Sequence, residues 1–150
     1  MYRNVQSGVM GMDNRQRWVM TLADADFDIA DAFAVALTVP ASGSYRLRVD
    51  GYAATVCTEV LYEGATIGTP GTAYTWRSEE RSDALEDADV GVSAEYGGTY
   101  TGGTQISTKV SNDPKPTEFG LKPSTIYRLT FTSKADNNAA SLRLTLSKRR

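Results

Sequence analysis

The sequence comprises 150 residues, a length that suits one domain built around a single core. Lys and Arg number 16 against 18 Asp and Glu, and the resulting net charge of −2 argues against a nucleic-acid partner. Cys57 is the only cysteine and histidine is absent, which excludes an intrachain disulfide and any histidine-based metal or acid–base site. Neither an apolar run of about 20 residues nor a secretory signal is present, so we expect cytosolic synthesis and no membrane partner.

Residues 1–14 follow no regular pattern, because glycines interrupt their apolar residues. We expect an irregular N-terminal arm there, followed by a single β-sandwich domain over residues 15–150. Such an arm is either a flexible terminus or a segment that docks on a neighbouring subunit. In the second case the candidate contacts are four apolar side chains: Tyr2, Val5, Val9 and Met10.

The first predicted strand covers residues 15–22, where Trp18, Met20 and Leu22 occupy one face. An acidic stretch with Asp at positions 24, 26, 28 and 31 follows. Clustered carboxylates suit a calcium ion, but Ile29 and Val35 stand where an EF-hand loop needs Gly and Glu. We therefore predict a solvated strand edge or loop, whose charges discourage pairing with another sheet edge.

Residues 33–39 and 44–52 predict two strands with a short turn between them. In both segments apolar residues alternate with charged or smaller ones, so each strand has one face for the core. Their separation predicts a β-hairpin. Gly51 within the second segment predicts a bulge or bend.

Two further strands are predicted at residues 56–62 and 72–77. Cys57 lies in the first of them, where a thiol without a histidine to activate it is expected to be a small buried hydrophobe. Residues 79–89 then contain six carboxylates and no apolar stripe for a packed helix. We predict an exposed loop or short helical turn, which is either simply solvated or a docking surface for a basic partner.

The remaining sequence predicts further strands in succession. Residues 90–96 and 104–110 are two candidates, joined by the glycine-rich residues 97–103. This connection is not a phosphate-binding loop, because strand-like sequence rather than a helix follows it. A short strand is expected at residues 117–121, and residues 120–149 predict a closing β-hairpin around a polar turn.

Eight to ten short strands, little helix and turn residues between them predict an all-β fold, an antiparallel β-sandwich that is jelly-roll-like. Aromatic side chains such as Tyr45, Trp76, Tyr127 and Phe131 then fill the space between the sheets. An aromatic row on such a sandwich can also stack against sugars. The residues for this carbohydrate-binding alternative are Tyr74, Trp76, Tyr96 and Tyr100.

Two segments, residues 61–81 and 119–144, resemble sequences of tailed-bacteriophage virion proteins. In that group an EGA turn and a GT pair lead to a polar loop with Arg, and a later LKP-x-T-x-Y strand precedes an apolar closing strand. The matching positions are Glu63, Gly64, Ala65, Gly71, Thr72, Arg77, Arg81, Leu121, Lys122, Pro123, Thr125, Tyr127 and Leu129. The loop after the GT pair differs, with Ser78, Glu79 and Glu80 where the family often has Asn.

The resemblance implies a jelly-roll structural protein of the phage head, specifically a capsid decoration (cement) protein. Such a protein is expected to bind the outer surface of the major capsid protein lattice as a homo-oligomer, a dimer or trimer, and to stabilise the head. It is synthesised in the host cytoplasm and resides on the capsid surface of the virion. We expect no cofactor, metal, nucleic-acid partner or enzymatic activity. The alternatives are a head–tail connector or tail structural protein, and a carbohydrate-binding module.

Contacts with the capsid are expected in the arm, in the acidic segment and in the basic residues that close the sequence, because complementary charges set the register of an interface. Symmetry multiplies a modest interface over many copies, so no catalytic residue is needed. Glycoside hydrolysis by a carboxylate pair is the least favoured class, because it needs a cleft that holds both groups. Besides the arm residues, the candidate contacts are Glu79, Glu80, Asp83, Glu86, Asp87, Lys148, Arg149 and Arg150.

Overall fold

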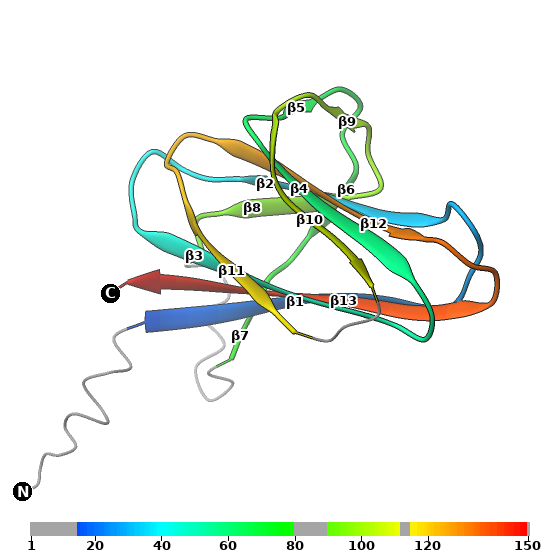
Figure 1. Ribbon diagram of the computed structural model, residues 1–150. Helices are drawn as coiled ribbons and strands as arrows, with labels where there is room; N and C mark the ends of the chain where they lie inside the picture. Colours follow the sequence, from blue (N-terminus) through cyan, green and yellow to red (C-terminus); the bar gives the residue numbers. More distant parts are fainter. Residues whose placement is uncertain (1–14, 80–89, 112–114, 150) are drawn as a thin grey trace, which may run out of the picture.

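The computed structural model describes residues 15–79, 90–111 and 115–149, and every regular element within these ranges is a β-strand (Figure 1). The predicted all-β class is confirmed. No helix in these ranges is long and apolar enough to cross a membrane. The strands are β1 (Arg15–Phe27), β2 (Ala32–Thr38), β3 (Tyr45–Ala53), β4 (Cys57–Glu63), β5 (Thr66–Ile67), β6 (Thr72–Tyr74), β7 (Arg77–Ser78), β8 (Ser93–Tyr96), β9 (Tyr100–Thr101), β10 (Thr104–Ser111), β11 (Thr117–Leu121), β12 (Ile126–Ser133) and β13 (Asn138–Arg149).

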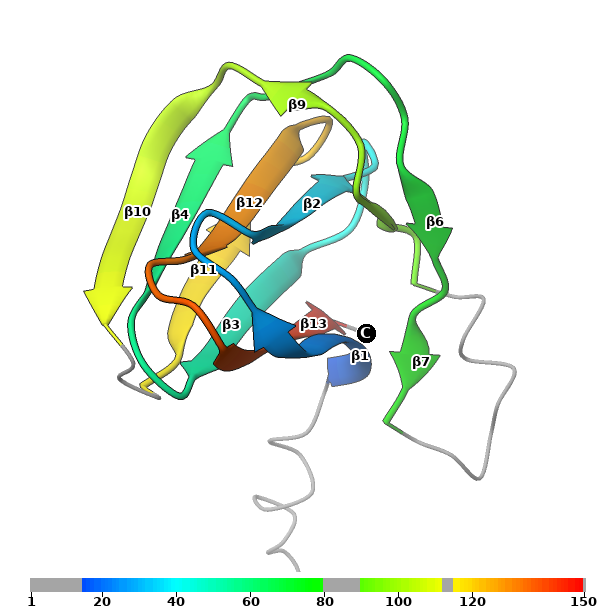
Figure 2. The same ribbon diagram turned by 90° about the vertical axis from the view of Figure 1, so that its right-hand side faces the viewer.

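Two antiparallel sheets pack face to face, as the end-on view shows (Figure 2). Sheet A has the order β11-β3-β13-β1-β7, and sheet B has the order β10-β4-β12-β2-β8-β6. Four strands of each sheet form the core of the sandwich, namely β11-β3-β13-β1 in sheet A and β10-β4-β12-β2 in sheet B. In chain order, successive strands of these eight lie in alternate sheets, except that β4 and β10 both lie in sheet B. This order is that of a jelly roll, so the predicted jelly-roll-like sandwich is confirmed.

Both hairpins predicted from the sequence are wrong. β2 pairs with β12 and β3 pairs with β13, so the strands of each predicted hairpin lie in different sheets. Their short connections arch from one sheet to the other instead of turning within a sheet. The alternation of apolar and polar residues shows which face of each strand is turned to the core. It does not distinguish two strands that pair side by side in one sheet from two strands that face one another across the core.

The core lies between the sheets, where the inward side chains of both interdigitate. The inward positions predicted for Tyr45, Trp76, Tyr127 and Phe131 are confirmed, because all four side chains are at most 3% exposed. β12 alternates half-buried and buried residues along its whole length, as a strand with one core face must. The largest fully buried side chains are Trp18, Trp76, Tyr127, Met20, Leu37, Leu47, Leu61, Leu129, Leu142, Leu144, Leu146 and Val35.

Gly51 does not mark the predicted bulge. It lies in β3 opposite Leu142, with regular pairing on either side, and the register shifts occur in β1 and β10 instead. A Cβ atom at Gly51 would lie 2.6 Å from the Phe131 ring and 2.7 Å from the Glu59 carboxylate. The glycine therefore makes room for two side chains of the facing sheet, a reason that a single-strand pattern does not reveal.

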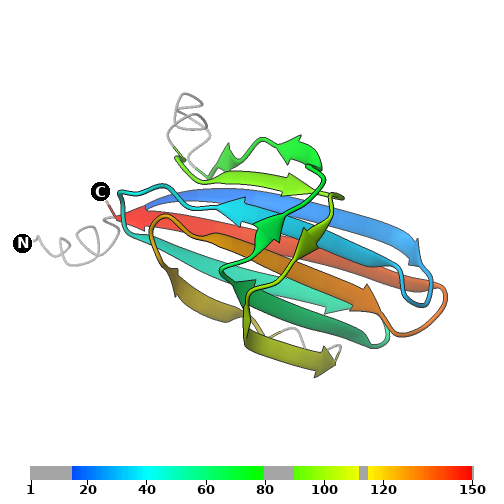
Figure 3. The same cartoon turned by 90° about the horizontal axis from the view of Figure 1, so that it is seen from above.

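An insertion between β4 and β10, residues 64–103, extends the jelly roll. Its described part crosses the outside of sheet B as the β5–β9 pair, adds β8 beside β2 and β6 beside β8, and adds β7 beside β1 (Figure 3). The single strand predicted at residues 72–77 is thus two short strands in different sheets. Trp76 lies between them and is 2% exposed, so the insertion covers the flank on which β1 and β2 would otherwise be edge strands.

Candidate functional site

Three of the predicted contact residues lie in the described part of the chain: Glu79, Lys148 and Arg149. Lys148 places its Nζ atom 5.7 Å from the centroid of the Tyr45 ring, a cation–π distance. The others lie outside the described residues: Tyr2, Val5, Val9, Met10, Glu80, Asp83, Glu86, Asp87 and Arg150.

The three described contact residues lie at one end of sheet A, with Glu79 separated from Lys148 and Arg149 by β1. Arg149, at the end of β13, lies opposite Arg15, at the start of β1 (Figure 1). Glu79 follows β7, and its amide donates a 2.9 Å hydrogen bond to the carbonyl oxygen of Arg17 on β1. Three positions are therefore neighbours in space: Arg15, which follows residues 1–14, Glu79, which precedes residues 80–89, and Arg149, which ends β13.

The outer face of sheet A contains a hollow of about 590 Å³, which we call the arginine trough. Four arginines, three carboxylates and two hydroxyl side chains line it. They are Arg17 of β1, Arg46, Arg48 and Asp50 of β3, Glu118 of β11, Arg143, Thr145 and Ser147 of β13, and Glu79. Those on β1, β3 and β13 alternate with buried core residues, so their side chains point to solvent, and Glu118 of β11 is exposed as well.

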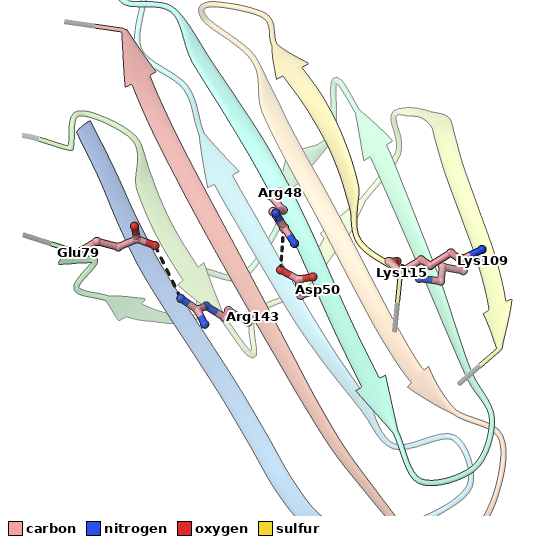
Figure 4. Close-up of polar contacts among 6 residues, drawn as sticks. All are labelled: Arg48, Asp50, Glu79, Lys109, Lys115 and Arg143. Carbon is pink, nitrogen blue, oxygen red and sulfur yellow. Dashed lines mark hydrogen bonds and ion pairs between the residues drawn. The ribbon is translucent and has the colours of Figure 1, made fainter. Parts of the chain in front are cut away.

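Three ion pairs connect side chains of the trough, two of them shown in Figure 4. Their closest atoms are Arg46 Nε and Glu118 Oε1 at 3.7 Å, Arg48 Nε and Asp50 Oδ2 at 3.2 Å, and Arg143 Nη2 and Glu79 Oε2 at 3.7 Å. The arginine side chains are 45%, 49% and 54% exposed. Exposed pairs of this kind contribute at most about 1 kcal/mol each, so they orient the guanidinium groups more than they stabilise the fold.

The arginines of the trough were not among the site residues predicted from the sequence. Alternation placed Arg46 and Arg48 on the polar side of their strand, but it gave no neighbour for that strand. The sheet order β3-β13-β1 brings Arg143 and Arg17 beside them from distant parts of the chain. The sequence feature that could have indicated the trough is the recurrence of arginine at outward positions of three strands, β1, β3 and β13.

The sequence resemblance maps to a second cluster, which we call the clasp: Glu63, Lys122 and Tyr127. Lys122 Nζ lies 2.9 Å from Glu63 Oε1, and the Tyr127 hydroxyl donates a 2.9 Å hydrogen bond to Glu63 Oε2. The same hydroxyl accepts a 2.9 Å hydrogen bond from the Lys122 amide. The clasp therefore ties the end of β4 to the start of β12 and to the connection that precedes it.

The environment of the clasp shifts the pKa of two of its groups. The hydrogen bond with Lys122, followed by the one from Tyr127, lowers the pKa of the Glu63 carboxyl. Burial raises the pKa of the Tyr127 phenol, and its hydrogen bond to the Glu63 carboxylate acts in the same direction. Both shifts favour an ionised Glu63 that accepts a hydrogen bond from a neutral Tyr127.

Backbone contacts join the same two matching segments. The amides of Gly64 and Ala65 both donate 2.9 Å hydrogen bonds to the carbonyl oxygen of Ile126. The Thr125 hydroxyl donates a 2.9 Å hydrogen bond to the carbonyl oxygen of Pro123, which shapes the turn before β12. The EGA turn and the LKP-x-T-x-Y segment are therefore one structural unit.

The four aromatic residues named for sugar stacking do not form an exposed platform. Trp76 is buried, and Tyr74 and Tyr96 are partly buried against the core. The rings of Tyr74 and Tyr96 meet edge to face, with centroids 6.3 Å apart and an interplanar angle of 68°. The Tyr100 hydroxyl accepts a hydrogen bond from a backbone amide of its own loop. These rings pack within the fold.

In the acidic stretch after the first predicted strand, aspartate side chains accept hydrogen bonds from nearby backbone amides. β1 extends as far as Phe27, and Asp24 Oδ1 accepts a 2.9 Å hydrogen bond from the Asp26 amide. Asp31 Oδ2 accepts one of 3.0 Å from the Asp28 amide. These side chains are exposed, which confirms the predicted solvated strand edge and loop. Among the described residues, no group of three or more ligating side chains could hold a metal ion.

Cys57 is 1% exposed, as predicted for a small buried hydrophobe. Burial raises the pKa of its thiol, against the effect of a 3.4 Å hydrogen bond donated by the Asn138 side-chain amide. A buried thiol that stays protonated is a poor nucleophile.

No protein-family model and no curated protein matches this chain. Among solved structures it is similar to a protein of the disulfide-linked pili of Bacillus endospore appendages, at 9% sequence identity, over 90% of this chain and 86% of that one, with a TM-score of 0.35. It is also similar to the CBM36-1 domain of a multidomain xylanase from the hindgut metagenome of Trinervitermes trinervoides, at 12% identity, over 89% and 96%, with a TM-score of 0.35. A third is a chain of the acidic stable capsid of Helicobacter pylori bacteriophage KHP30, at 9% identity, over 87% and 92%, with a TM-score of 0.27. Likenesses this distant carry no argument about function.

Proposed function

We propose that the protein is a structural component of a tailed-bacteriophage virion, a decoration protein that binds the outer surface of the major capsid protein lattice and stabilises the head. The observation that carries the proposal is the corner of sheet A. There Arg15, Glu79 and Arg149, the described ends of the three predicted contact segments, are neighbours beside the arginine trough. One compact corner lets all three segments act on the same partner.

The sequence resemblance to virion proteins supports the proposal further. Glu63 is 64 residues from Tyr127 along the chain, yet it contacts both Tyr127 and Lys122 of the second matching segment. Positions that depend on one another physically are expected to occur together, whereas a chance match has no reason to select partners in space.

The chain acts as a homo-oligomer, a dimer or trimer, on the capsid surface, after synthesis in the host cytoplasm. Each subunit then needs only a modest interface, because simultaneous engagement of several subunits multiplies the affinity. Complementary charge at the corner and in the trough steers docking and sets the register.

Copy number in the virion tests the role. Quantitative mass spectrometry of purified virions of the phage that encodes this chain is expected to find it in hundreds of copies, as a lattice coat requires. About a dozen copies would instead identify a connector between head and tail, and absence from the virion would contradict the proposal altogether.

Removal of residues 1–14 tests the arm as a contact element. We expect the shortened chain to bind heads more weakly while its thermal unfolding transition stays unchanged. Lys134→Gln, a change of an exposed lysine in the β12–β13 connection, is the control for binding. Unchanged binding by the shortened chain would remove the arm from the interface.

A further inference from the structure

We propose that the arginine trough is the docking site for an extended acidic segment of a partner protein. The inference rests on the proposed function for the identity of that partner, the major capsid protein. The site itself is argued from the arginines, carboxylates and hydroxyls that line one hollow of about 590 Å³ on the outer face of sheet A.

Short side chains on β13 form the floor of the trough. Thr145 lies opposite Arg48 of β3, and Ser147 lies opposite Arg46. On the other side Ser147 lies near Arg17 of β1, because the register pairs it with that residue. Adjacent strands are about 4.8 Å apart, so Arg46 and Arg17 stand on strands roughly 10 Å apart on either side of this floor. The trough is therefore open along β13 and has guanidinium groups on both sides.

The spacing of the arginines along β3 matches that of an extended peptide. Arg46 and Arg48 lie two residues apart on one strand and face the same side, at a separation of about 6.8 Å. Side chains on one face of an extended segment repeat at the same interval. A segment that lies along β13, with carboxylates two residues apart, therefore meets both guanidinium groups.

The ion pairs already present leave the arginines able to accept a further carboxylate. Arg46, Arg48 and Arg143 contact their partners at 3.7, 3.2 and 3.7 Å and are about half exposed. A guanidinium group carries five N–H donors in a planar fork, which suits two-point binding of a carboxylate.

The carboxylates in the trough favour a protein partner over a nucleic acid. Asp50, Glu79 and Glu118 lie among the arginines, so a phosphate backbone would meet repulsion along its length. A protein segment can place a Lys or Arg opposite each of them. We therefore expect a partner segment that is mainly acidic, with basic residues at intervals.

The test compares an arginine-trough double variant, Arg46→Gln with Arg48→Gln, with the native chain. The probe is a fluorescent synthetic peptide with Glu at every second position and Lys at intervals between them, measured by anisotropy at low salt, and a DNA duplex is the competing polyanion. We expect the double variant to bind the probe at least about tenfold more weakly. Lys134→Gln is the matched control at an exposed position outside the trough, and Arg48→Lys keeps the charge but loses the planar fork. Circular dichroism melting verifies that each variant is folded.

A second arm measures sedimentation of the same proteins with virion heads from which the native copies have been stripped. Loss of head binding by the double variant supports the inference. If the double variant binds heads as well as the native chain does, the trough does not contact the capsid, and the proposed function is unaffected. Failure of the native chain itself to bind heads contradicts the proposed function. Independently of heads, the inference is overturned if the double variant binds the peptide as tightly as the native chain does, or if DNA binds the native chain as tightly as the peptide does.

Discussion

The clasp and the arginine trough are both polar clusters, but they differ in burial and in how the sequence encodes them. In the clasp Tyr127 is fully buried and Glu63 is 23% exposed, although Lys122 is 69% exposed, whereas the paired arginines of the trough are all about half exposed. The clasp coincides with the positions that resemble virion proteins, and the trough coincides with no motif. The motif positions of this sequence therefore hold strands together, whereas the proposed docking surface is assembled from outward positions on separate strands.

The largest effect is expected from Tyr127→Ala, which removes both a buried ring and the hydroxyl of the clasp. Truncation of a buried aromatic side chain leaves a cavity and costs about 3–5 kcal/mol in the free energy of unfolding. Urea denaturation followed by tryptophan fluorescence measures it, because Trp18 and Trp76 are buried in the same core. A loss below about 1 kcal/mol, the size expected for a surface position, would contradict the burial of this residue.

Tyr127→Phe separates the hydroxyl from the ring. It leaves the Lys122 amide and one oxygen of Glu63 without the partner they have in the native chain, so we expect a loss of about 1–2 kcal/mol. Tyr52→Phe is the matched control, because that side chain is 53% exposed and its hydroxyl is hydrated whether the chain is folded or not. Equal stability of the two variants would show that the clasp contributes nothing beyond its buried ring.

Glu63→Gln tests the charge of the clasp through pH. Because the folded protein has a lowered pKa at Glu63, the carboxylate stabilises the fold above the unfolded-state value of about 4.3. This contribution is lost as pH falls through the lowered folded value. The difference in melting temperature between the native chain and the variant is therefore expected to be largest near neutral pH and to shrink below pH of about 4. Glu118→Gln, at a carboxylate that is 53% exposed, is the control and should show a smaller difference at neutral pH.

The smallest effect on stability is expected in the trough. Arg48→Gln removes an exposed ion pair, so the free energy of unfolding should change by no more than about 0.5 kcal/mol. Chemical denaturation of this variant beside Tyr127→Phe makes the comparison direct. If Arg48→Gln proved the more destabilising of the two, the trough would be part of the stabilising framework and the distinction between the clusters would fail.

Local patterns predicted much of the fold correctly. Alternation identified both the strands and their inward faces, since β3 and β13 bury the residues at every second position that the sequence indicated. It failed at connections, where β2 to β3 and β12 to β13 arch between sheets. Alternation also gave the wrong role for Gly51, because this glycine makes room for the Phe131 ring of the facing sheet and does not form a bulge.

The candidate site was predicted only in part. Glu79 was named from its acidic segment, and it does line the trough, but Arg17, Arg46, Arg48 and Arg143 were not named. Charge runs are visible along a chain, whereas a cluster built from single residues on different strands is not. Its members become neighbours only through the order of strands in sheet A.

The sequence indicated most of the strands and the side of each strand that faces the core, because both properties depend on neighbours along the chain. The tertiary structure alone decided which strands pair, that the chain crosses between sheets and that four arginines share one hollow. These depend on contacts between distant residues. Period-two alternation is compatible with many pairings, and only the joint packing of both sheets selects one of them.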